Sequence, residues 1–79
     1  KMPSAVISIP SKDLQYQISQ IYNGVGNKER VKYHLKELTE RDDIVMEDYL
    51  LYGKSFIQNL DDYQEAKIIF KTIYDNFLI

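Results

Sequence analysis

Apolar residues recur at helical spacing along most of the chain. Intervals of three and four residues place them on one face of a helix, and the pattern predicts helices at about 12–24, 28–40, 44–58 and from 63 to the end. The expected inward positions are Leu14, Ile18, Ile21, Tyr22 and Val25 in the first helix, Val31, Leu35 and Leu38 in the second, and Tyr49, Tyr52, Phe56 and Leu60 in the third. The fourth helix carries Tyr63, Ala66, Ile69, Phe70, Ile73, Tyr74 and Phe77, of which Ala66, Phe70 and Ile73 are expected to pack on the third. Four helices joined by short turns pack as neighbouring antiparallel pairs, so the predicted fold class is all-α.

Residues favoured at helix ends mark the predicted boundaries. Ser11 is a good N-cap, and Asp13 places a negative charge in the first turn. Gly24 and Gly26 end the first helix, and Asn27 caps the second. Three carboxylate pairs near the later helix starts are interpreted as capping groups: Asp42-Asp43, Glu47-Asp48 and Asp61-Asp62, the last with Glu65 at the capping-box spacing.

Residues 1–10 differ from the rest of the chain. Pro3 and Pro10 bracket a stretch rich in β-branched residues, a composition that disfavours helix. We interpret this segment as an extended lead-in or linker, with the alternative that Val6, Ile7 and Ile9 cover apolar surface of the helices. The remaining residues, 11–79, suffice for one compact domain. Because the chain begins with Lys1 rather than Met, we expect it to be part of a larger protein.

The helical part contains an internal repeat. At an offset of 34 residues the first and third helices match, and past the turn the offset is 35, so the second turn has one extra residue. The matched positions are Ile18 with Tyr52, Ser19 with Gly53, Tyr22 with Phe56, Val31 with Ala66, Leu35 with Phe70, and Leu38 with Ile73. A 34-residue period of helix-turn-helix units is typical of tetratricopeptide repeats.

The second unit resembles the tetratricopeptide consensus closely at Tyr49, Tyr52, Gly53, Phe56, Asp61, Tyr63, Glu65, Ala66 and Phe70. The first unit is looser, with Ser19 and Val31 at the small positions and Gln15 where an aromatic residue is usual. The resemblance implies two repeats, about 12–45 and 46–79, in a short right-handed α–α superhelix of four antiparallel helices. An unrelated four-helix fold is the alternative. Small residues at Gly53 and Ala66 would let paired helices approach closely, so we expect these residues and their counterparts to be buried.

Composition excludes several classes of function. The net charge of −2 gives no reason to expect nucleic acid as a partner. The absence of cysteine excludes disulfides and thiolate metal sites. No apolar run approaches the roughly 18 to 20 residues of a membrane span. The compartment stays open between the cytoplasm and the soluble tail of a larger membrane-associated protein.

The sequence offers no catalytic motif. His34, the one imidazole, is expected to point outward from the second helix, without a catalytic or metal role. Gly24 and Gly26 form part of a phosphate-loop pattern, but no strand precedes them. We therefore expect no enzyme activity, cofactor or metal. The lysine row Lys28, Lys32 and Lys36 alternates with glutamates and is interpreted as a solvated face with the helical pairs Lys36–Glu40 and Glu37–Arg41.

The resemblance implies a concave binding surface lined by the first helix of each repeat. Its expected partner-binding residues are Tyr16, Gln20, Asn23, Leu50, Lys54 and Ile57. Tyr16 and Gln20 stand where the family's carboxylate clamp has Lys and Asn, so that clamp is not expected. Amides mixed with apolar groups suit a helix or an extended peptide. The predicted function is a protein–protein interaction or scaffolding module that binds a peptide or partner protein.

Two other functions are considered. One is structural self-association, a homodimer through the C-terminal helix, because Ile68, Ile69, Phe77 and Leu78 leave apolar side chains beyond the inward stripe. A terminal repeat normally needs a polar outer face or a capping helix. Further chain sequence or the lead-in would also cover this surface. The other is a regulatory domain that closes around a small peptide.

Overall fold

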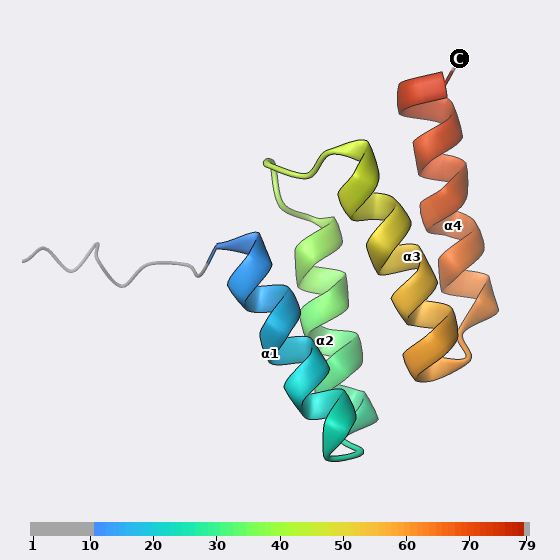
Figure 1. Cartoon of the computed structure of the whole chain (residues 1–79). Coiled ribbons are helices and arrows are strands. Elements are labelled where there is room, and N and C mark those ends of the chain that lie inside the picture. Colours follow the sequence, from blue (N-terminus) through green and yellow to red (C-terminus); the bar gives the residue numbers. More distant parts are fainter. Residues whose placement is uncertain (1–10, 79) are drawn as a thin grey trace, which may run out of the picture.

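The computed structural model describes residues 11–78, which form four consecutive α-helices and a final π-helical turn (Figure 1). The elements are α1 (Lys12–Gly24), α2 (Lys28–Thr39), α3 (Met46–Leu60), α4 (Tyr63–Ile73) and the π-helical η2 (Tyr74–Leu78). Within this range there is no strand, so the all-α prediction is confirmed. The predictions made for residues 1–10 lie outside the described residues.

Each helix packs against the next one along the chain, α1 on α2, α2 on α3 and α3 on α4. Figure 1 shows α1 and α4 at opposite ends of this row. The Cα positions extend 45 × 34 × 14 Å along the principal axes. The helices therefore form a flat array with two open ends, one at α1 and one at α4.

Side-chain caps begin three of the helices as predicted. Ser11 accepts a hydrogen bond from the Leu14 amide, Asn27 from the Arg30 amide and Asp62 from the Glu65 amide, each at 3.1 Å. These bonds satisfy amides that lack a partner within the helix.

The start of α3 differs from the prediction. The helix begins at Met46, and the Asp48 carboxylate accepts a hydrogen bond from the Val45 amide at 3.1 Å. Asp43 is not the cap of this helix. It accepts two hydrogen bonds from Arg41 instead.

The turns inside the two helical pairs are closed in a similar way, although the second is one residue longer. Gly26 (φ 78°) and Asp61 (φ 53°) are the two described residues with positive φ, and they lie 35 positions apart. The amide that follows each bonds back into the preceding helix, Asn27 to the Tyr22 carbonyl at 3.0 Å and Asp62 to the Phe56 carbonyl at 2.9 Å. Such hydrogen bonds are typical of an α-helix that ends with one residue in the left-handed backbone conformation. The structure thus repeats at the offset found in the sequence.

The core is centred on α2 and α3, with α4 closing one side. Its most deeply buried members are Val31, Leu35, Leu38, Tyr52, Phe56 and Ala66, followed by Ile69 and Ile73. All of them except Ile69 were predicted to face inward. The prediction for α2 is confirmed at every position.

The inward face of α1 was predicted wrongly at three of its five positions, whereas Tyr22 packs against the core as predicted. Leu14, Ile21 and Val25 are 53%, 66% and 73% exposed, and the buried residues of α1 are Gln15 and Ser19. Both polar groups have partners, since Ser19 Oγ donates to the Tyr16 carbonyl at 2.6 Å and Gln15 Oε1 accepts from Arg41 at 3.2 Å. These partners offset the cost of burying polar atoms. Helix α1 can therefore bury Gln15 and Ser19 while Leu14, Ile21 and Val25 stay exposed.

One prediction for α4 is also corrected. Ile69, expected on an outer surface that contacts a partner, lies in the core at 4% exposure. Tyr63 of α4 and Tyr74 of η2 are exposed.

The close approach of α3 and α4 occurs at Gly53. A Cβ atom built on Gly53 would lie 2.5 Å from Cε1 of Phe70, so the Phe70 ring occupies the space a side chain would need. Ala66 is buried nearby in the same pair, and the counterparts Ser19 and Val31 are fully buried. The prediction that all four small positions are buried is confirmed.

Gly53→Ala is expected to lower the free energy of unfolding by about 1 kcal/mol, measured by urea denaturation. Overpacking against Phe70 costs roughly 1 to 3 kcal/mol, which exceeds the gain of about 1 kcal/mol in helix propensity. Gly24→Ala is the matched control, because nothing lies within 4 Å of a Cβ atom there. Its stability should stay equal or rise. A Gly53→Ala protein as stable as the control would contradict the close approach.

Candidate protein-interaction surfaces

The two helical pairs are joined by polar contacts between α1 and α3. The Tyr16 hydroxyl lies 2.8 Å from Ser55 Oγ, and the Tyr16 ring packs on the Tyr52 ring with centroids 5.9 Å apart. At the other end of α1, Lys12 Nζ forms an ion pair with Asp48 at 2.6 Å. Ser55 and Tyr52 are buried at this contact. We call these contacts, together with the lysine contacts below, the junction.

Three lysines of α2 extend the junction. Their partners are the Asn59 carbonyl for Lys28 (2.8 Å), Asp62 for Lys32 (4.0 Å) and Glu65 for Lys36 (3.0 Å). The row is largely exposed to solvent as predicted, but the prediction that Lys36 pairs with Glu40 is wrong, because its partner is Glu65. Partly exposed ion pairs contribute little free energy each, but together these contacts fix how the second pair sits on the first.

The six predicted partner-binding residues do not form one uniform surface. Tyr16 belongs to the junction, where its ring and hydroxyl contact α3. On α1, Gln20 and Asn23 are half-buried, and Gln20 Nε2 donates to Ser19 Oγ at 3.2 Å. The α3 residues are more accessible: Leu50 and Lys54 are exposed, and Ile57 is half-buried against the core.

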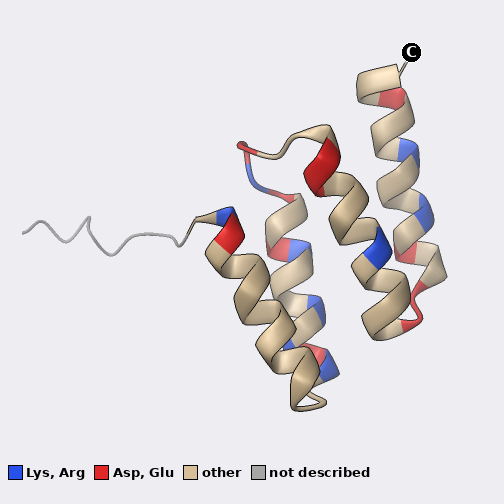
Figure 2. Ribbon diagram, viewed as in Figure 1, with Lys and Arg blue, Asp and Glu red and all other residues tan. Residues whose placement is uncertain are grey.

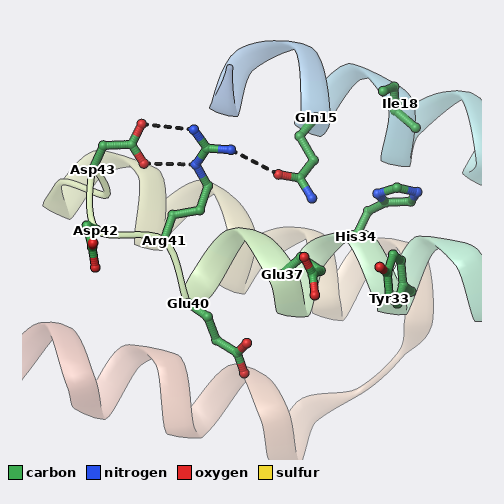
Figure 3. A pocket seen from close by; sticks show the side chains of 9 residues that line it. All are labelled: Gln15, Ile18, Tyr33, His34, Glu37, Glu40, Arg41, Asp42 and Asp43. Carbon is green, nitrogen blue, oxygen red and sulfur yellow. Dashed lines mark hydrogen bonds and ion pairs between the residues drawn. The ribbon is translucent and has the colours of Figure 1, made fainter. Parts of the chain in front are cut away.

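A groove that the sequence reasoning missed lies between α1, α2 and the loop leading to α3 (Figure 3). It encloses about 700 Å³ and is lined by Gln15, Ile18, Tyr33, His34, Glu37, Glu40, Arg41, Asp42 and Asp43. Arg41 donates to both Asp43 oxygens at 2.8 and 3.1 Å and to Gln15 at 3.2 Å. The guanidinium holds the pKa of Asp43 below its ordinary value. Gln15 at a position usually aromatic was the one signal of this groove in the sequence.

His34 was predicted to point outward, but its side chain is half-buried against α1. Its ring stacks on Tyr22 of α1 with centroids 5.6 Å apart and meets Tyr33 edge-on at 5.1 Å. Nδ1 is buried and has no hydrogen-bond partner among the described residues. Burial, assisted by the positive charge of Arg30, lowers the pKa of His34 below 6.5.

Both ends of the helical array expose apolar side chains. On α1 these are Leu14, Ile21 and Val25, with Ile18 half-buried, and Figure 2 shows that α1 carries charge only at its first residues. At the other end, Ile68, Phe77 and Leu78 are exposed as expected, with Phe77 also 6.0 Å from the Tyr49 ring. The two apolar ends of the array are therefore candidate interaction surfaces in addition to the groove.

In the part of the chain that the structure describes, no group of three or more His, Cys, Asp or Glu side chains is placed to hold a metal ion. None of the described helices combines the length and apolar content needed to cross a bilayer. Comparison with models of protein families, with curated proteins and with solved structures finds no match to this chain. The described residues therefore form a small four-helix all-α domain for which no family is identified.

Replacing Tyr16 by Phe removes one hydrogen bond of the junction. We expect the free energy of unfolding to fall by about 1 kcal/mol, because buried Ser55 loses its partner across the junction. In a Ser55→Ala background the same change should cost much less. Tyr33→Phe, on the half-exposed Tyr33 of α2, is the control and should change little. Equal costs of Tyr16→Phe in both backgrounds would show that the two hydroxyls do not interact.

His34 should make stability depend on pH below about 6.5, the ordinary pKa of a histidine in an unfolded chain. Since its pKa is lower in the folded chain than in the unfolded chain, the unfolded state takes up the proton first as the pH falls. The free energy of unfolding therefore decreases as the pH drops below about 6.5 and through the folded pKa. His34→Phe keeps an aromatic ring beside Tyr22 and should make the denaturation midpoint constant over this range. The same slope in both proteins would mean that another group titrates.

Proposed function

We propose that this chain is a module of two tetratricopeptide-like repeats that binds a peptide or a segment of a partner protein and acts as a docking or scaffolding unit. The observation that carries the proposal is the repetition of the turn. Gly26 and Asp61 both have a positive φ, 35 positions apart, and each is followed by a capping residue, Asn27 or Asp62. Although the second turn is one residue longer, both turns reverse the chain, so α1 and α3 run in the same direction (Figure 1). A superhelix of repeats requires this arrangement.

The burial of the small positions supports the same assignment. Ser19 and Gly53 are buried in the first helix of each pair, and Val31 and Ala66 in the second. In each pair the first helix then presents the remaining side to a ligand. On this side the accessible groups are Gln20 and Asn23 of α1 and Leu50, Lys54 and Ile57 of α3.

This surface favours a short extended peptide. The amides of Gln20 and Asn23 offer both donors and acceptors to a peptide backbone, while Leu50 and Ile57 offer apolar contact. Lys54 is exposed and has no ion-pair partner among the described residues, so an acidic residue in the ligand would complement it. Tyr16 contributes indirectly, by fixing α1 against α3.

Self-association through α4 is the second candidate function. It is favoured by the exposure of Phe77 and Leu78 at the end of the array. Ile69 cannot contribute because it is buried in the core, and Ile68 lies on a different side of α4 from the aromatic residues that face the open end.

Peptides selected from a displayed random library should bind with an affinity that depends on this surface. Lys54→Glu is expected to weaken binding about tenfold or more, as observed for central interface residues, while stability stays unchanged. Lys67→Glu, an equally exposed lysine change on α4, is the matched control and should bind as the unmodified chain does. Isothermal titration supplies the affinities. Selected peptides whose affinity is the same for both variants would place the binding surface elsewhere and contradict the proposal.

A further inference from the structure

The junction between the two helical pairs defines which faces a third pair would contact. On the second pair, the side of α3 that meets α1 and α2 carries Asp48, Tyr52, Ser55 and Asn59. Their counterparts on α1, at the 34-residue offset, are Leu14, Ile18, Ile21 and Val25, which we call the leading face. No described residue covers this face, and three of its four side chains are more than half exposed.

The opposite end of the array has a matching surface. On the first pair, the groups that meet α3 and α4 include Lys12, Tyr16 and Lys28. Their counterparts in the second pair are Met46, Leu50 and Tyr63, and Tyr74 lies about three turns beyond Tyr63 on the same side of α4. We call Met46, Leu50, Tyr63 and Tyr74 the trailing face. Leu50, Tyr63 and Tyr74 are exposed and Met46 is half-buried.

The leading and trailing faces carry apolar residues at positions where the junction carries polar ones. These positions are related by the repeat offset. Four of the six contacts of the junction correspond to apolar pairs when one face is placed on the other, whereas Lys32–Asp62 and Lys36–Glu65 correspond to the polar pairs Lys67–Asn27 and Lys71–Arg30. The correspondences are Lys12–Asp48 with Met46–Leu14, Tyr16–Ser55 with Leu50–Ile21, Tyr16–Tyr52 with Leu50–Ile18, and Lys28–Asn59 with Tyr63–Val25. Polar side chains would be more favourable at these positions if the faces were exposed to water. If each face bound an unrelated partner, nothing would require it to match the other end of the same chain.

We propose that copies of this chain associate head to tail, with the leading face of one copy packed on the trailing face of the next in the geometry of the junction. The inference rests on the repeat register that also underlies the proposed function. The contact uses different surfaces on the two copies, so it is heterologous and leaves one free face at each end of the assembly. It therefore differs from a symmetric dimer through α4.

One pair opposes the contact. Lys36 and Glu65 attract each other across the junction, but their counterparts, Lys71 and Arg30, are both positive. Asp75, which lies 2.8 Å from Lys71, offsets part of this repulsion. Because salt screens exposed charges, association should strengthen as the salt concentration rises. Arg30→Glu places an acidic residue opposite Lys71 and in the first turn of α2, where negative charge is favourable, so this variant should associate more tightly.

Sedimentation velocity of the complete chain over a range of concentrations tests the proposal. The unmodified chain should form species that grow beyond a dimer as the concentration rises. Ile21→Glu on the leading face and Tyr74→Glu on the trailing face should each weaken association about tenfold or more. Ile68→Glu, which changes an exposed isoleucine outside both faces, is the control and should associate as the unmodified chain does. All the substituted side chains are exposed, and circular dichroism checks that each variant is folded.

Mixing the two face variants gives the decisive result. Ile21→Glu keeps an intact trailing face and Tyr74→Glu keeps an intact leading face, so an equimolar mixture should form a heterodimer and nothing larger. Val25→Glu replaces Ile21→Glu if the latter is not folded. A mixture that stays monomeric, a symmetric dimer lost only in Tyr74→Glu, or a chain that remains monomeric at every concentration and salt level would each overturn the proposal. None of these variants alters a residue of the proposed peptide-binding surface. Because Leu50 belongs to both that surface and the trailing face, sedimentation is measured without peptide, so that its failure is distinguishable from a failure of peptide binding.

Discussion

The contact between Gly53 and Phe70 sets the geometry on which the other features depend. A ring from α4 fills the space beside a residue of α3 that has no side chain, so the two helices approach closely and their rotations become fixed. Ser19 and Val31 are buried at the equivalent places of the first pair. Once the inward face of each helix is fixed, its other faces are assigned as well. One meets the neighbouring pair, one meets solvent on the proposed binding side, and one is left open at the end of the array.

The junction shows how a small chain keeps two helical pairs in register with modest core area. The apolar core extends through α2 and α3, while polar links from Lys12, Tyr16 and Lys36 reach the second pair around its edge. Each link contributes little free energy alone, but a shift of one pair along the other would break all of them. The same register relates the two ends of the array. For this reason the leading face on α1 and the trailing face on α3, α4 and η2 can be considered as two halves of one contact.

Much of the fold could be predicted from the sequence, because its signals are local. Helix ends follow from Ser11, Asn27 and Asp62, and the core of α2 follows from apolar spacing. The face of α1 could not be predicted in this way. Leu14 and Ile21 have the spacing of a buried stripe, but which side of a helix is buried depends on what the neighbouring helix offers. Gln15 could be buried because Arg41, 26 residues away, supplies a hydrogen bond. The groove beside His34 and the lysine links of α2 were missed for the same reason: they depend on residues brought together only by the fold.

The arrangement of the helical pairs is tested most directly by nuclear Overhauser contacts in solution. The account predicts contacts from the Gly53 α-protons to the Phe70 ring and from the Tyr16 ring to the Tyr52 ring, with none between α1 and α4 at low protein concentration. Contacts between α1 and α4 within one molecule, together with loss of the Gly53–Phe70 contact, would indicate a closed bundle and contradict it.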